Sequence, residues 1–168
     1  MADHQRKDVG AASTNRGEEA FQPERTVGVL AISPNDDDHL YLANIFGHTN
    51  WQLRTAHTWG EALTTLARQR IPILVCESQL IDATWKEVLA GLSRMPERPV
   101  LIVASRLADE SFWAEVLNLG AYDVLMKPFD ATEVFRVVSL AWLSWKNDRE
   151  RHVGHSIASA EYARAAGL

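Results

Sequence analysis

The chain has 168 residues, of which 46% are hydrophobic and 23% charged, and its net charge is −5 at pH 7. This length and composition are typical of one globular domain with tails, rather than of a disordered or membrane-embedded chain. The negative net charge argues against a nucleic-acid surface. No apolar run reaches the roughly 18 residues of a membrane span, and residues 1–24 lack the apolar core of a signal peptide. We therefore expect a cytoplasmic protein without nucleic-acid or membrane partners.

The first predicted elements follow an aperiodic segment. Residues 1–25 mix small, polar and charged residues, which predicts a flexible N-terminal arm. Val27 to Ile32 is a short apolar run closed by Ser33-Pro34-Asn35, as in a buried strand that ends in a loop. The next segment predicts a helix with aspartates 36–38 in its first turn, where the helix dipole favours them, and with its apolar face at Tyr41, Leu42, Ile45 and Phe46.

The alternation of strand and helix repeats four more times. Further strands are predicted at 51–56, 73–76, 100–104 and 124–126, and further helices start near Thr58, Trp85, Asp109 and Ala131. Five such units predict an α/β fold with a doubly wound, five-stranded parallel sheet. Right-handed crossovers would place the strand ends, and with them Ser33, Glu77, Ala104 and Lys127, along one edge of the sheet.

One segment carries a specific resemblance. Residues 119–130, LGAYDVLMKPFD, resemble nearly residue for residue the end-of-domain signature of receiver domains in bacterial two-component response regulators, and the spacing from Glu77 to Leu89 fits the same family. The resemblance implies the flavodoxin-like, CheY-like sheet order 2-1-3-4-5 and a cis bond between Lys127 and Pro128. It divides the chain into the arm, a receiver-like domain at 26–146 and a C-terminal tail at 147–168 that can be helical.

The same resemblance implies a phosphorylation pocket, and this chain departs from it. The phosphoacceptor position falls on Glu77, the acidic pair on Ser33 and Pro34, the hydroxyl on Ala104 and the aromatic switch on Val124, while Lys127 and Pro128 are retained. These departures predict a degenerate pseudo-receiver that works without phosphorylation, has no enzyme activity and needs no cofactor. Moving the register to use aspartates 36–38 as the acidic pair would push a proline into a central strand.

Glu77 is expected to form an ion pair with Lys127. Either this pair mimics an activated state, or the site is inactive and Glu77 only keeps the lysine from being buried unpaired. The alternative function is a genuine phosphoacceptor that a histidine kinase phosphorylates with Mg²⁺, using Glu77 or another carboxylate with help from Asn35 and Asp36.

Cysteine and histidine are the other residue types here that could carry chemistry. Cys76 is the only cysteine and lies in an apolar strand, which indicates a packed thiol. His39, His48 and His57 show no ligand spacing with carboxylates, so we predict no metal site.

The last helix is richer in apolar residues than packing on one sheet face requires. It carries Phe135, Trp142 and Trp145, and the resemblance adds the preceding helix with Trp113 to the expected contact face. This predicts a protein partner, such as a histidine kinase or another signalling protein, and a homodimer through the last helix. The alternative interpretation of these apolar residues is that the last helix is simply well buried within the chain.

Overall fold

The computed structural model describes residues 27–165 of the chain. The predicted N-terminal arm at 1–25 lies outside the described residues. Five parallel strands form one sheet in the order β2-β1-β3-β4-β5. They are β1 Val27–Ile32, β2 Trp51–Ala56, β3 Ile73–Glu77, β4 Val100–Ser105 and β5 Asp123–Met126. The predicted fold class and strand order are confirmed.

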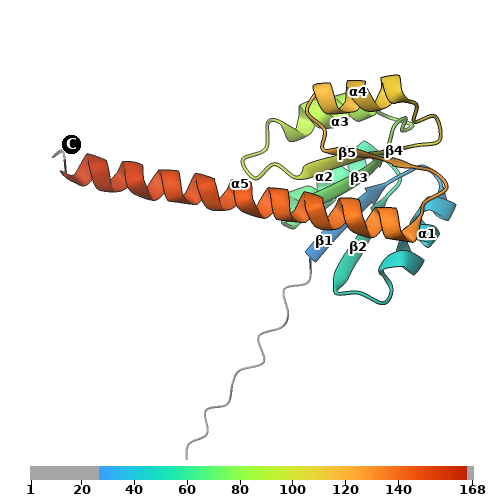
Figure 1. Cartoon of the computed structure of the whole chain (residues 1–168), viewed down its shortest axis with the longest axis horizontal. Coiled ribbons are helices and arrows are strands. Elements are labelled where there is room, and N and C mark those ends of the chain that lie inside the picture. Colours follow the sequence, from blue (N-terminus) through green and yellow to red (C-terminus); the bar gives the residue numbers. More distant parts are fainter. Residues whose placement is uncertain (1–26, 166–168) are drawn as a thin grey trace, which may run out of the picture.

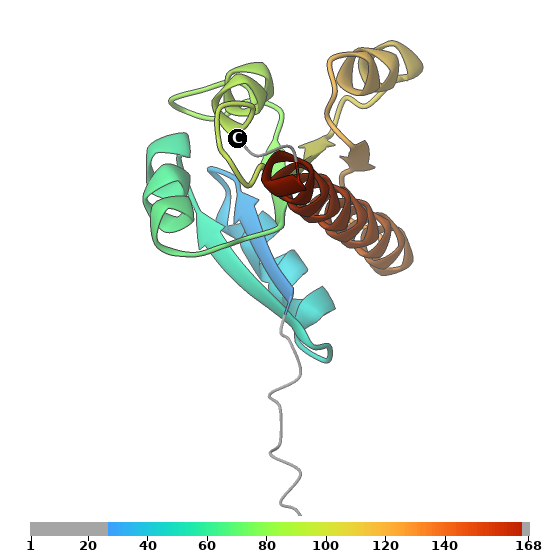
Figure 2. The ribbon, with the colours of Figure 1, turned by 90° about the vertical axis from the view of Figure 1, so that its left-hand side faces the viewer.

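Five helices connect and cover the strands, and Figure 1 shows the whole arrangement. They are α1 Asp36–Phe46, α2 Trp59–Arg68, α3 Trp85–Leu92, α4 Glu110–Asn118 and α5 Ala131–Ala165. Helices α1 and α5 pack on one face of the sheet, and α2, α3 and α4 pack on the other. In the turned view of Figure 2, α2 and α5 lie on opposite sides of the sheet. Alternate residues of the central strands therefore enter two separate cores, as in other doubly wound sheets.

The helix starts follow local sequence signals. The Thr58 hydroxyl accepts a hydrogen bond from the Glu61 backbone N–H, and Asp109 caps α4 in the same way. Thr84 and Glu87 form a reciprocal capping box at the start of α3. These caps set where each helix leaves the sheet edge.

The apolar face of α1 differs from the prediction. Tyr41 is 56% exposed, whereas Leu42, Phe46 and the charged residue Asp38 are buried. These three residues are four apart, so they form one narrow stripe along the helix. Tyr41 lies beside that stripe and faces solvent.

Helix α5 is much longer than the sheet it covers. It runs without a break from Ala131 to Ala165 and extends beyond the body of the domain (Figure 1). The sequence-based boundary at residue 146 therefore falls inside a continuous helix, and the segment assigned to a tail begins as part of it. Within residues 27–165, no helix is long and apolar enough to span a bilayer.

Candidate functional site

The candidate site lies where the central strands end. The strand register pairs Ile32 with Cys76, Glu77 with Ala104 and Ser105 with Met126, so the residues that follow β1 and β5 meet the end of β3 at one edge. This is the edge at which open parallel sheets place ligand-binding residues. The peptide bond between Lys127 and Pro128 is cis, as the resemblance implied.

Lys127 is the centre of this site. Its ammonium group is buried, with 3% of the side chain exposed, and it contacts carboxylates from two other elements. Nζ donates to Asp38 Oδ2 at 2.7 Å and also to Glu77 Oε2. We call Asp38, Glu77 and Lys127 the lysine site. The predicted ion pair between Glu77 and Lys127 is present.

Both carboxylates accept further hydrogen bonds, Asp38 at the oxygen that faces Lys127 and Glu77 at its other oxygen. Ser33 Oγ donates to Asp38 Oδ2 at 2.5 Å. Glu77 Oε1 accepts from the Ser78 backbone N–H at 3.1 Å and from the Ser78 hydroxyl at 3.0 Å. A carboxylate whose oxygens are held by fixed donors is a weak nucleophile, because attack on phosphorus would break those bonds first.

The electrostatics favour the ionised form of Asp38. Burial alone would raise the pKa of Asp38, but hydrogen bonds from Lys127 and Ser33 outweigh it and lower the pKa below its ordinary value. Asp38 and Glu77 both pair with the Lys127 ammonium group, which is the condition under which buried charged groups are tolerated.

The other predicted pocket positions surround the lysine site without adding charge. Ala104 and Val124 are buried in the two cores, Pro34 is half-buried and Pro128 is exposed. Ser105, one residue after the hydroxyl position, is buried, and its Oγ accepts from the Leu107 backbone N–H at 3.1 Å.

Asp38 is the functional residue that the sequence analysis missed. The sequence pattern groups it with Asp36 and Asp37 as a first-turn charge, although only Asp38 enters the pocket. The signal was its position four residues before Leu42 and eight before Phe46, on the buried stripe of α1. Asp36 instead turns to His57, whose Nε2 lies 2.8 Å from Asp36 Oδ1.

The four aromatic residues of the predicted contact face are all half-buried. Trp113 Nε1 donates to Asp123 Oδ1 at 3.0 Å. Phe135 and Trp142 pack edge-on against Phe46 and Trp51, respectively. The Arg149 guanidinium lies over the Trp145 ring. These side chains thus have partners within the chain, and their role in binding another protein stays a prediction.

Cys76 is buried, and burial raises the pKa of its thiol far above the ordinary value. It is therefore a packed thiol rather than a nucleophile, as the sequence indicated.

Solved structures that match this architecture include receiver domains. The signal receiver domain of an HD domain-containing protein from Pseudomonas fluorescens Pf-5 matches with a TM-score of 0.69 and 22% identity, over 76% of this chain and 94% of that one. The chemotaxis response regulator CheY4 of Vibrio cholerae matches with a TM-score of 0.62 and 17% identity, over 69% of this chain and 98% of that one. The chain therefore has the fold of response-regulator receiver domains.

A curated relative matches part of the chain in sequence. The "Probable transcriptional regulatory protein TcrX" of Mycobacterium tuberculosis is 32% identical over 103 residues, which is 58% of this chain and 44% of that protein. The chain thus matches less than half the length of this relative. No protein-family model matches the chain.

Proposed function

We propose that this chain is an atypical response-regulator receiver module that acts through protein contacts and does not depend on phosphorylation. The observation that carries the proposal is the pairing of Lys127 with both Asp38 and Glu77 inside the buried pocket. In the resemblance, this lysine is the group that would meet a phosphoryl oxygen. Here two carboxylates already neutralise it, which supports a pocket held in one state without phosphate.

The positions around the lysine site support the same proposal. An incoming Mg²⁺ needs oxygen ligands, and Ser33 and Pro34 supply no carboxylate where the acidic pair is expected. Ala104 and Val124 lack the hydroxyl and the aromatic ring that would move in response to phosphate. A phosphoryl group in this pocket would thus have neither a cation to neutralise its oxygens nor a side chain that moves in response to it.

The experiment is intact-mass analysis of the chain after incubation with acetyl phosphate and Mg²⁺, with Glu77→Asp as the matched variant. We expect the wild type to gain no phosphoryl group. An adduct on Glu77→Asp alone would mean that the pocket stays competent and that the longer side chain silences it. An adduct on the wild type, lost in Glu77→Gln, would contradict the proposal.

The alternative function is a genuine phosphoacceptor used by a histidine kinase. One observation favours it: two carboxylates, Asp38 and Glu77, converge at the strand ends beside a lysine. For this function Lys127 would have to release at least one of them to a cation. A titration with Mg²⁺ in the absence of a phosphoryl donor distinguishes the two functions. Only the phosphoacceptor function predicts saturable Mg²⁺ binding, and Glu77→Gln should weaken that binding.

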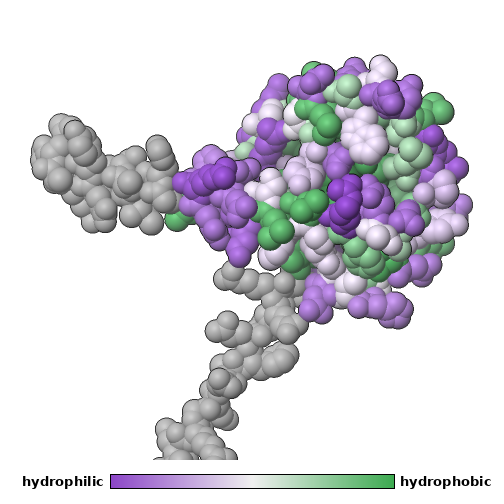
Figure 3. Space-filling view, in the orientation of Figure 1, coloured by the Kyte–Doolittle hydropathy of each residue, from purple (hydrophilic) through white to green (hydrophobic). Residues whose placement is uncertain are grey.

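The proposed contact surface is the outer face of α5, through which we propose a homodimer. Leu140 is 44% exposed and Leu143 46% exposed, and they are three residues apart on one side of the helix. Hydrophobic surface is visible among polar groups where α5 crosses the domain (Figure 3). Apolar surface of this kind supports a role in contacts between proteins.

Sedimentation velocity over a range of concentrations tests this surface. We expect the wild type to dimerise, Leu143→Glu to be monomeric, and Leu63→Glu, an exposed leucine on α2 across the sheet, to behave like the wild type. A wild type that stays monomeric throughout would rule out the homodimer and leave a different protein as the partner.

A further inference from the structure

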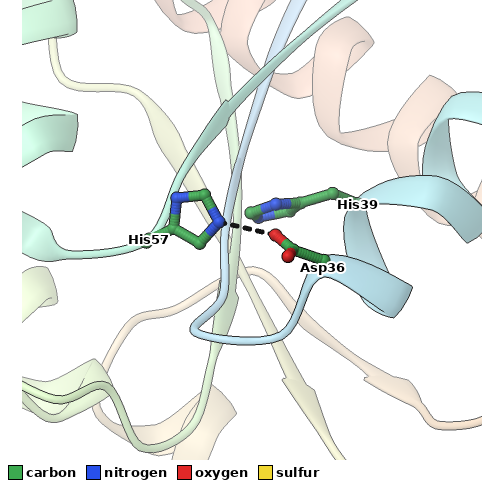
Figure 4. A group of neighbouring side chains, drawn as sticks. All are labelled: Asp36, His39 and His57. Carbon is green, nitrogen blue, oxygen red and sulfur yellow. Dashed lines mark hydrogen bonds and ion pairs between the residues drawn. The ribbon is translucent and has the colours of Figure 1, made fainter.

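Three side chains with metal-ligating atoms meet beside the start of α1. Asp36 and His39 lie in its first turn, and His57 directly follows β2; Figure 4 shows all three pointing toward one another. The strand pairing brings them together, because Ile32 is in register with Ala56 and the Ser33 N–H donates to the Ala56 carbonyl at 3.1 Å. We call these residues the histidine cluster.

The histidine cluster contains an unsatisfied buried nitrogen. His39 is only 8% exposed, and its Nε2 has no hydrogen-bond partner. Among the side chains that the structure describes, it is the one buried nitrogen or oxygen in this condition. A buried polar atom without a partner costs on the order of 1–3 kcal/mol, and such atoms in folded proteins call for a bound water, an ion or another explanation.

His39 is placed to share one ion with His57. A neutral imidazole has one ring nitrogen with a free lone pair, which is the form that binds transition metals. The ring also lies edge-on to His57, with the centroids 4.9 Å apart, so nothing apolar separates the two histidines.

The other two members are exposed and adjustable. Asp36 Oδ1 and His57 Nε2 form a hydrogen bond at 2.8 Å with each other, and His39 Nε2 is left without a hydrogen-bond partner. A metal ion on Asp36 Oδ1 and His57 Nε2 would displace the proton between them, which moves to Nδ1 of a neutral His57 or leaves a protonated His57 for solvent, and the ion would give His39 its missing partner.

The spacing fits one metal ion. The three candidate ligand atoms lie within 4.8 Å of one another. Zinc bonds of about 2.0–2.1 Å in a tetrahedral site put ligand atoms roughly 3.4 Å apart, so rotation of the exposed Asp36 and His57 side chains by about 1 Å closes the set. Two imidazoles and one carboxylate suit zinc, copper, iron or nickel, whereas magnesium takes mainly carboxylate and water oxygens.

We propose that Asp36, His39 and His57 form a binding site for one divalent transition-metal ion, with its fourth position open to water or to a partner's side chain. This site is distinct from the lysine site, and the proposal does not rest on the proposed function. It does connect the two, because the turn of α1 that provides Asp36 and His39 also positions Asp38 against Lys127. A bound ion would tie that turn to the end of β2.

Zn²⁺ is the probe for the first test, by isothermal titration calorimetry of the full chain. We expect the wild type to bind one ion per chain. We expect the affinity to be ten- to a hundredfold lower in His57→Ala and in Asp36→Ala, because these changes remove exposed ligands without disturbing a core. The matched control is His48→Ala, an exposed histidine after α1 that lies outside the cluster and whose loss should leave the affinity unchanged.

Visible spectroscopy of bound Co²⁺ supplies the second readout. We expect the absorption of a four-coordinate ion in the wild type and His48→Ala, and its loss in His57→Ala and in His39→Leu. Equal Zn²⁺ affinity in the wild type and His57→Ala would overturn the proposal and assign the metal to other histidines. So would no binding by the wild type at micromolar Zn²⁺, which would leave Asp36 and His57 as a hydrogen-bonded pair only.

Discussion

The first turn of α1 contributes to two clusters of opposite character. Asp38 turns inward to the lysine site, where every carboxylate has a fixed donor and the lysine is buried. Asp36, two residues earlier, turns outward to the histidine cluster, where an exposed pair stands beside an imidazole nitrogen that has no partner. A two-residue step along a helix rotates the side chain by about 200°, which separates the two environments.

This difference shows that binding capacity depends on unsatisfied groups rather than on composition. The lysine site has two carboxylates, but both already pair with its own ammonium group. The histidine cluster has fewer charges, yet it has a buried ring nitrogen without a partner and two exposed side chains that can move. Substitutions that unpair the first cluster should therefore cost stability, whereas those that remove the unpaired atom of the second should not.

The largest expected effect comes from Lys127→Met. This change keeps the length of the side chain but leaves Asp38 and Glu77 buried without a counter-charge, and we expect the free energy of unfolding to fall by about 3 to 5 kcal/mol. Urea denaturation followed by circular dichroism measures it. The control is Lys86→Met, which removes an exposed pair with Glu115 and should cost less than about 1 kcal/mol. Equal losses for the two variants would mean that the lysine site contributes no more than a surface ion pair.

A smaller loss is expected from Asp38→Asn. The amide keeps the shape of the carboxylate and can still accept from Lys127, but it loses the charge that strengthens this bond and the bond from Ser33. We expect the free energy of unfolding to fall by about 2 kcal/mol, the scale of a hydrogen bond to a charged group. Asp37→Asn, at an exposed position in the same turn, is the matched control and should be neutral. If Asp38→Asn leaves the free energy of unfolding unchanged, then Glu77 alone holds the lysine.

The sequence predicts the fold well because its signals are local. Apolar runs, caps at Thr58, Thr84 and Asp109, and a glycine with φ of +97° at Gly120 mark where elements start and end. The ion pair of Glu77 and Lys127 was also predictable, because both residues directly follow buried parallel strands whose ends meet at one edge.

The rest of the site depends on the directions in which side chains point, and residue spacing along the chain does not give these directions. Three successive aspartates read alike as first-turn charges, and only the buried stripe through Leu42 and Phe46 distinguishes Asp38. His39 and His57 showed no ligand spacing because a helix and a strand separate them, and the pairing of β1 with β2 brings them together. Contacts of this kind become visible only once the register of the sheet is known.

The histidine cluster gives the opposite expectation from the lysine site when its buried group is removed. His39→Leu replaces an unpartnered ring by an apolar side chain with a higher helix propensity, and we expect the metal-free chain to gain about 1 kcal/mol in free energy of unfolding. Thermal and urea denaturation in the presence of a chelator measure the gain. Adding Zn²⁺ should then stabilise the wild type and leave the variant unchanged. A variant less stable than the wild type in chelator would mean that the ring makes packing contacts worth more than its unsatisfied nitrogen costs.

The smallest effect is expected from Asp36→Asn in the metal-free chain. Its carboxylate is exposed, and the hydrogen bond with His57 lowers the pKa of Asp36 and raises that of His57 in a contact that water screens. We expect the urea midpoint to stay within the error of the measurement, in contrast to Asp38→Asn two residues away. A clear loss for Asp36→Asn would show that the exposed pair anchors the start of α1 by itself, and the two clusters would then differ in exposure but not in their contribution to the fold.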